Sequence, residues 1–133
     1  MGSQYLIDTN AVIDYLGKKL PPSGMSFLHT VVDQIPNLSI ISKIEVLGYK
    51  LPADSYEVLR GFINDSHVLM LSDDIAERSI ELRKQQKIKL PDAIIAATAL
   101  VYNFEIITRN TADFKNIIGL TVIDPWNTSF TLK

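Results

Sequence analysis

Short runs of apolar residues alternate along the chain with longer stretches in which apolar residues recur every three or four positions. The short runs predict buried β-strands, and the periodic stretches predict amphipathic helices. Strands are expected at residues 4–8, 37–42, 67–72, 105–109 and 120–125. Helices are expected at residues 10–19, 23–34, 42–50, 54–66, 72–86, 90–104 and 110–116. The helix at 90–104 is apolar nearly all round, which predicts that it is buried.

The order of these elements predicts the fold class. Continuously apolar strands are typical of a parallel sheet that is covered on both faces, and alternation of strands with helices favours right-handed crossovers. We therefore expect an α/β fold, a three-layer α/β/α sandwich with a parallel four- or five-stranded sheet. The length of 133 residues suits a single domain spanning residues 1–133.

Composition and charge exclude several kinds of site. The chain has no cysteine, which rules out zinc–thiolate sites, cysteine nucleophiles and disulfides. No apolar run approaches the roughly 20 residues of a membrane span, and the N-terminus lacks a signal-peptide pattern. We therefore expect a cytoplasmic protein that does not enter a membrane. The net charge of -2 means that any nucleic-acid contact requires a local basic patch.

Four acidic residues fall where the predicted sheet would gather them. Asp8 ends the first strand, Glu45 lies about one helical turn after the second, and Asp113 follows the fourth. Asp92 opens the buried helix that leads into the fourth strand. Loops at the carboxyl edge of a parallel sheet converge, and sites in open α/β sheets form there. We expect these four carboxylates to meet at one edge of the sheet.

The first two acids also have purely structural interpretations. Asp8 could cap the helix that it precedes, and Asn10 is another candidate N-cap in that segment. Ser42 and Glu45 fit a capping box, in which the Glu45 side chain would bond back to the Ser42 amide. On either interpretation the carboxylate would serve the start of a helix and not a shared site.

The other two acids have the same ambiguity. Asp92 in the first turn of a helix is favoured by the helix dipole alone, and Asn110 with Asp113 forms another capping pattern. The joint pattern favours a shared site, because all four acids fall at one predicted edge. By contrast, we expect Asp14 on the first helix to reach water and Trp126 to pack in the core or as a lid at an edge.

Clustered carboxylates repel one another, and without a cation the pKa of some of them rises. A hard divalent cation removes the repulsion, and an oxygen-only ligand set suits Mg²⁺ or Mn²⁺ better than zinc. Such a metal can activate water and stabilise the charge of an in-line displacement at phosphorus. The acids therefore predict phosphodiester hydrolysis.

Four segments carry a family resemblance, namely "YLIDTNAVIDYL", "ISKIEVLGY", "LPDAIIAATAL" and "IITRNTADF". In order and spacing they resemble the PIN-domain ribonucleases, especially the VapC-type toxins of bacterial and archaeal toxin–antitoxin pairs. The third segment followed closely by the fourth is the most specific part. Together the segments span nearly the whole chain, and the PIN fold that the resemblance implies is the α/β/α sandwich expected from the pattern.

The resemblance implies roles for individual residues. The catalytic, metal-binding quartet would be Asp8, Glu45, Asp92 and Asp113, with Asp8 and Asp92 as the principal ligands. Asn110 is the alternative at the corner of the site that Asp113 occupies. Residues that orient the acids or waters would be Thr9, Asn10, Thr108 and Asn110.

The resemblance also implies an activity and partners. PIN-domain toxins are usually endoribonucleases that depend on Mg²⁺ or Mn²⁺, their usual partner is a small antitoxin whose C-terminal segment occupies the active-site groove, and they commonly form homodimers through helices. An RNA substrate needs positive charge near the acidic edge. The candidates for RNA binding are Lys43, Lys87, Lys89 and Arg109. The alternative for the lysines after residue 86 is a solvated helix end favoured by its dipole.

Two other functions are compatible with parts of this pattern. One is a non-catalytic PIN-like module that binds RNA or protein. The other is a phosphotransfer domain that uses Asp8 as a nucleophile, as haloacid-dehalogenase-like phosphatases do. Those enzymes need a second aspartate two residues later, where this chain has Asn10.

Overall fold

The computed structural model describes residues 4–127, and within them the strands form one five-stranded sheet. Its strands are β1 (Tyr5–Ile7), β2 (Asn37–Ser39), β3 (His67–Leu69), β4 (Glu105–Ile107) and β5 (Val122–Ile123). Their spatial order is β3-β2-β1-β4-β5, and every pairing is parallel. The predicted parallel sheet is therefore confirmed, with five strands.

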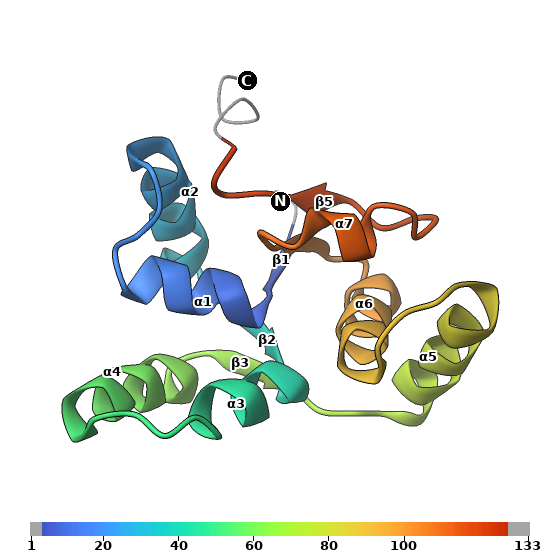
Figure 1. Ribbon diagram of the computed structural model, residues 1–133, viewed down its shortest axis with the longest axis horizontal. Coiled ribbons are helices and arrows are strands. Elements are labelled where there is room, and N and C mark those ends of the chain that lie inside the picture. Colours follow the sequence, from blue (N-terminus) through green and yellow to red (C-terminus); the bar gives the residue numbers. More distant parts are fainter. Residues whose placement is uncertain (1–3, 128–133) are drawn as a thin grey trace.

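The helices of the same residues cover both faces of the sheet. They are α1 (Thr9–Leu16), α2 (Pro22–Asp33), α3 (Ile40–Leu47), α4 (Ala53–Asn64), α5 (Asp73–Gln85), α6 (Leu90–Tyr102) and α7 (Thr111–Phe114). Figure 1 shows α1 to α4 on one side of the sheet and α5 and α6 on the other. The predicted three-layer α/β/α sandwich is confirmed. No helix between residues 4 and 127 is long and apolar enough to cross a membrane.

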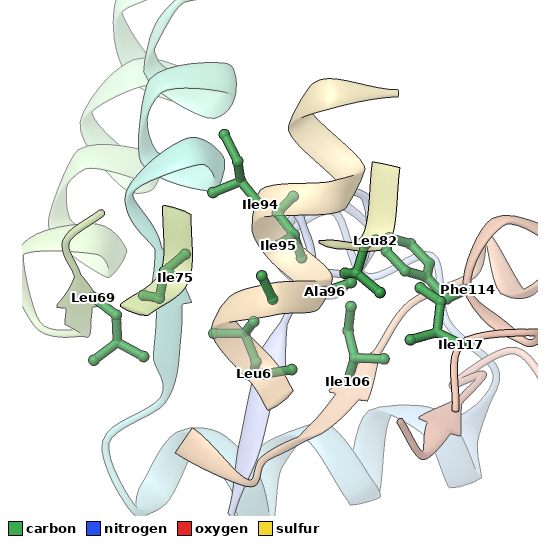
Figure 2. Close-up of a cluster of buried hydrophobic side chains, with 12 residues drawn as sticks. Leu6, Leu69, Ile75, Leu82, Ile94, Ile95, Ala96, Ile106, Phe114 and Ile117 are labelled. Atoms are coloured by element: carbon green, nitrogen blue, oxygen red, sulfur yellow. The ribbon is translucent and has the colours of Figure 1, made fainter. Parts of the chain in front are cut away.

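Alternation along the central strands divides the core into two halves. Successive side chains of a strand point to opposite faces of the sheet. Leu6 and Ile106 accordingly pack with α5, α6 and α7, whereas Ile7 and Ile107 pack with α1 to α4. Figure 2 shows Leu6 and Ile106 beside α6, with Phe114 of α7 at the edge of the same cluster. All four strand residues are at most 1% exposed, so both faces of the sheet are covered at its centre.

Helix α6 is the most deeply buried helix among the described residues. Every residue from Ala93 to Ala99 is buried, and its small alanines allow close packing against α5 and β4. The helix ends at Asn103, which adopts the left-handed conformation that closes many helices. The predicted buried helix is therefore confirmed, with its end two residues earlier than expected.

The second strand is shorter than the sequence predicts. Residues 40–42 continue the apolar run of β2, but they form the first turn of α3. The switch occurs because the Ser39 side chain accepts a hydrogen bond from the Ile41 amide and so caps the helix. This early turn moves Glu45 closer to the end of the sheet than a strand through residue 42 would allow.

The strand order places a crevice at a defined point of the sheet. The chain leaves β1 toward β2 and β3 on one side, and later returns to β4 and β5 on the other side. The connections that leave β1 and β4 therefore diverge between these two strands. In open α/β sheets ligands bind at such a switch point, beyond the carboxyl ends of the strands.

The segment after β5 is held against α2. A Cβ atom on Gly24 would lie 2.1 Å from the Pro125 carbonyl oxygen, so only glycine allows this approach. The contact brings Trp126 toward the first helix. The rest of the predicted tail, residues 128–133, lies outside the described residues.

Candidate metal centre

Asp8 stands at the end of β1 and begins α1 as its N-cap. Its Oδ1 accepts a hydrogen bond from the Thr9 amide at 2.8 Å. Its Oδ2 accepts hydrogen bonds from the Thr108 hydroxyl at 2.8 Å and from Asn10 Nδ2 at 3.3 Å. The capping role considered for Asp8 is therefore real, and Asn10 is not the N-cap. Three donors on one carboxylate compensate much of the cost of its burial.

Thr108 and Asn10 join the ends of β1 and β4. The buried Thr108 hydroxyl, which donates to Asp8, accepts hydrogen bonds from Asn10 Nδ2 at 3.1 Å and from the Asn110 amide at 3.0 Å. Asn10 Oδ1 accepts a hydrogen bond from the Arg109 amide at 3.0 Å. The structure thus brings these three expected supporting residues, Asn10, Thr108 and Asn110, into one network around Asp8.

Glu45 faces α1 instead of the start of its own helix. The Thr9 hydroxyl donates to Glu45 Oε1 at 2.6 Å and lies 3.0 Å from Ser42 Oγ. The capping-box alternative is wrong, because Ser39 caps α3 and Ser42 lies inside the helix. Thr9 is therefore a direct link between the first helix and the second predicted acid.

Asp92 has the most unfavourable electrostatic surroundings of the four acids. Burial raises its pKa to about 6, and the negative charges of Asp8, Asp113 and Glu45 add to this rise. The positive charge of Lys89 lowers the pKa, but less strongly. No side chain or amide within residues 4–127 donates a hydrogen bond to the Asp92 carboxylate. Asp92 is thus a partly buried acid that faces three others without a compensating donor.

Burial also raises the pKa of Asp8. The hydrogen bonds from Thr108 and Thr9 oppose this rise, and the charge of Glu45 adds to it. The two acids differ in their compensation, because Asp8 receives three hydrogen bonds while Asp92 receives none. The negative charges of Asp8, Glu45 and Asp113 all act on Asp92, so all three lie within electrostatic range of that carboxylate.

Two neighbouring clefts divide the acids between them. The first has a volume of about 290 Å³, and its lining includes Asp8, Glu45, Asp92, Arg109 and Asn110. The second has a volume of about 620 Å³ and is lined by Arg83, Lys87, Ile88, Lys89, Leu90 and Asp113. We call them the acidic cleft and the basic cleft. Lys43 lines neither cleft.

Asn110 lies between the two clefts. Its Nδ2 donates to Asp113 Oδ2 at 2.7 Å, while its own side chain lines the acidic cleft. Asp113 is exposed, and no capping hydrogen bond forms at the start of α7, so the capping interpretation of this pair is wrong. At the position where either residue could complete the acidic site, Asn110 therefore lies in the acidic cleft and Asp113 lies in the basic cleft.

The donor set fits a hard divalent cation only in part. Carboxylate oxygens are the ligands that Mg²⁺ and Mn²⁺ prefer, and a cation would lower the pKa of Asp92, which burial and then the three neighbouring acids raise. Among residues 4–127, however, no three acidic side chains stand close enough together to hold one ion between them. Mg²⁺ keeps several waters and often uses only one or two carboxylates, so the residues present fit a water-rich site.

A family model of the PIN domain matches residues 5–120. The chain belongs to the PIN domain family. The match covers both clefts and all four acids of this PIN domain. It confirms the family resemblance drawn from the four sequence segments.

Solved structures agree with this assignment. A chain of a toxin–antitoxin complex from Klebsiella pneumoniae is 35% identical to this PIN domain, with a TM-score of 0.73 over 93% of this chain and 99% of that chain. A chain of VapBC-1 from nontypeable Haemophilus influenzae is 26% identical, with a TM-score of 0.73 over 92% and 98%. A chain of DNA-bound VapBC from Salmonella typhimurium has a TM-score of 0.76 over 93% and 99%, and its 22% identity bears on the fold alone. No curated protein matches the sequence significantly.

One polar residue of this PIN domain was assigned wrongly from the sequence. Asp14 was expected to reach water, but it is buried and 3% exposed. It accepts hydrogen bonds from Arg109 Nη1 at 3.1 Å and from Trp126 Nε1 at 2.8 Å. A sequence signal did exist, because Asp14 lies four residues after Asn10 and therefore on the same face of α1.

Proposed function

We propose that this PIN domain is a Mg²⁺- or Mn²⁺-dependent endoribonuclease that hydrolyses RNA phosphodiester bonds. The observation that carries the proposal is the Asp92 carboxylate, which lacks a hydrogen-bond donor within residues 4–127 and faces Asp8, Glu45 and Asp113. Such repulsion disfavours the ionised carboxylate, and a bound cation would relieve it. The position of the acids at the sheet's switch point supports the same conclusion.

Asp8 and Asp92 would hold the cation directly, and Glu45 and Asp113 would act through water. When bound, the cation supplies the positive charge that stabilises an in-line displacement at phosphorus. The chain's own residues fix the geometry. Thr108 and the Thr9 amide orient Asp8, and the Thr9 hydroxyl orients Glu45.

Cleavage of RNA by the purified protein tests the proposal. We expect cleavage with Mg²⁺ or Mn²⁺, none in EDTA, and none with Asp8→Asn or Asp92→Asn. Glu77→Gln is the matched control, because Glu77 is an exposed acid on α5 without a hydrogen bond or ion pair in the described chain. Cleavage that survives both aspartate substitutions would contradict the proposal. Folded protein that binds RNA but never cleaves it would favour the non-catalytic module.

The alternative of an Asp8 nucleophile has little structural support. Asp8 is 5% exposed, and both of its carboxylate oxygens accept hydrogen bonds. A carboxylate held in this way can still offer a lone pair to a small cation at the cleft, but it lacks the freedom that an in-line attack on phosphorus requires. Failure of aluminium fluoride or fluoroberyllate to form an adduct on Asp8 is the expected result.

The basic cleft is the proposed path of the RNA backbone away from the acids. Lys87 and Lys89 line it together with Asp113, and the charge of Lys89 also reaches Asp92. Reversing Lys87 and Lys89 to glutamate should weaken RNA binding and flatten its dependence on salt, because each lost phosphate contact lowers the slope by about 0.7. Reversing Lys18 and Lys19, exposed at the end of α1, is the matched control. An unchanged slope in the first pair would exclude this path.

We further propose that the protein is the toxin of a VapBC-type pair and acts in the cytoplasm. The support is its 35% identity to a chain of a toxin–antitoxin complex. Its partner would be a small antitoxin, and the toxin itself would form a homodimer. Expression of the protein in cells, with and without an adjacent small reading frame, tests for the antitoxin. Growth arrest should occur only when that reading frame is absent. Light scattering of the purified protein tests for the homodimer.

A further inference from the structure

The side chain and the backbone of Arg109 are both fastened to α1. Its amide donates to Asn10 Oδ1 at 3.0 Å, and its guanidinium donates through Nη1 to Asp14 Oδ2 at 3.1 Å. Asn10 and Asp14 are four residues apart and share one face of the helix. Arg109 therefore lies along α1 from the centre of the acidic network toward Trp126.

The two partners of this ion pair differ in exposure. The Asp14 side chain is 5% exposed and the Arg109 side chain is 55% exposed. Trp126 Nε1 gives the same oxygen, Asp14 Oδ2, a second donor at 2.8 Å, so two different side chains hold the carboxylate. A buried acid with two donors is a fixed anchor, and both Asp14 and the Arg109 that it holds line the acidic cleft.

The guanidinium keeps unused donors. Within the described chain, only Nη1 of its nitrogens makes a hydrogen bond. Arginine has five N–H donors in a planar fork, which matches the oxygens of a phosphate. Arg109 lines the same cleft as Asp8 and Asp92. An arginine held in place before binding also loses less rotamer freedom when a phosphate arrives.

We propose that Arg109 binds a phosphate group of RNA in the acidic cleft and that Asp14 is the positioning residue that holds its guanidinium there. Trp126 supports Asp14 through its indole N–H. This assignment rests on the proposed function. It adds to that function a cationic contact on the acidic side of the site, separate from the lysines of the basic cleft.

Affinity for a labelled single-stranded RNA oligonucleotide, measured by anisotropy over a range of salt, tests the assignment. The measurements use full-length protein carrying Asp92→Asn, in which cleavage is not expected. Arg109→Ala should raise Kd about tenfold and lower the salt slope by about 0.7, the value for one phosphate contact. Arg109→Lys should restore the slope but not the full affinity, because it keeps the charge and loses the fork.

Asp14→Asn separates positioning from charge. It leaves Arg109 positive, so the salt slope should remain, while Kd rises about three- to tenfold because the guanidinium is no longer held. A purely structural role would lower only the melting temperature. If Asp14→Asn does not fold, Trp126→Phe decides instead, since it removes one hydrogen bond and keeps an aromatic ring. An unchanged Kd in the deciding variant overturns the role of Asp14.

The outcomes also separate this assignment from the proposed function. An unchanged Kd and slope in Arg109→Ala overturn the assignment even if the wild-type protein cleaves RNA. A wild-type protein that binds the oligonucleotide but does not cleave it overturns the proposed nuclease activity. The Kd of Arg109→Ala then shows by itself whether Arg109 contacts an RNA phosphate. A protein that binds no RNA overturns both.

Discussion

The Asp92 carboxylate carries an electrostatic penalty that Asp92→Asn should remove. In the folded protein without metal, burial and the charges of Asp8, Asp113 and Glu45 all disfavour its ionised form. Asparagine has nearly the same shape and no charge. Because no described donor bonds to Asp92, the substitution breaks no hydrogen bond. We therefore expect the metal-free variant to be more stable than the wild-type protein at neutral pH.

The size of the effect follows from the pKa of Asp92. The difference between the ordinary value of 3.8 and about 6 corresponds to about 3 kcal/mol of unfolding free energy. Asp92 is partly exposed, so solvent screening reduces this figure, and the helix dipole at the start of α6 offsets part of the remainder. About 1–2 kcal/mol of stabilisation is the expected result.

The effect must depend on pH with a defined sign. The pKa of Asp92 is higher in the folded protein than in the unfolded chain, so the folded state binds more protons between pH 3.8 and about 6. Stability of the wild-type protein therefore falls as pH rises through this window. Below it Asp92 is protonated in both states and the penalty disappears. The advantage of Asp92→Asn should be complete near pH 8 and small near pH 4.

Urea unfolding in EDTA, followed by circular dichroism at pH 4.5 and pH 8, measures this difference. Glu77→Gln is again the control, and its difference from wild type should be within about 0.5 kcal/mol at both values. An Asp92→Asn protein that is less stable than wild type at pH 8 would refute the electrostatic argument. An equal stabilisation at both pH values would refute it too, because the gain would then not come from the charge.

Divalent cations should reverse the order of stability. An ion that binds only the folded wild-type protein adds about 2.7 kcal/mol at a concentration one hundred times its Kd. Asp92→Asn loses a principal ligand and should gain much less from the same Mg²⁺ or Mn²⁺. The wild-type protein should then become the more stable of the two. Equal stabilisation of both proteins by the cation would remove Asp92 from the metal site.

Two further substitutions have matched controls in the chain. Thr108→Val should cost about 2–3 kcal/mol in urea unfolding, because its buried hydroxyl makes three hydrogen bonds. Thr98→Val should cost less than about 1 kcal/mol, since that hydroxyl bonds only a carbonyl of its own helix. Gly24→Ala should cost about 1–3 kcal/mol and shift the fluorescence of Trp126, the single tryptophan, by displacing Pro125. Gly61→Ala on α4 has open space around the new methyl group and should stabilise by about 0.5–1 kcal/mol. Equal effects within either pair would contradict the contacts described.

Most of the fold is encoded in local patterns. The two periodicities, two for strands and 3.6 for helices, separate the elements because each central strand is buried on both faces and most helices bury only one side. The prediction was wrong at the boundary between β2 and α3, where apolar residues continue across the junction. Ser39 decides that boundary by capping the helix. The hydrogen bond to the Ser39 hydroxyl starts the helix although the apolar residues continue, and hydrophobic periodicity does not detect a capping residue.

The location of the acids was predictable, but their partners were not. Parallel strands bring their carboxyl ends to one edge, so the positions of Asp8 and Asp92 follow from the order of elements. The hydrogen bond between Asp14 and Trp126 spans 112 positions of sequence. No local pattern connects two residues so far apart. Contacts of this kind depend on how the segment after β5 packs against α2, and the sequence alone gives no signal for that packing.

The distribution of hydrogen-bond donors among the four acids distinguishes Asp92, whose charge a cation would compensate, from Asp8, whose charge is already compensated by hydrogen bonds. Hydrogen-bond donors at the carboxyl edge are concentrated on Asp8, which receives three, while Glu45 and Asp113 receive one each. Asp92 enters the same edge from α6 and receives none among the described residues. Donors fix the position of a carboxylate, whereas a missing donor leaves its charge available. Asp8 is thus a rigid wall of the site, and Asp92 supplies the uncompensated charge that would attract the cation.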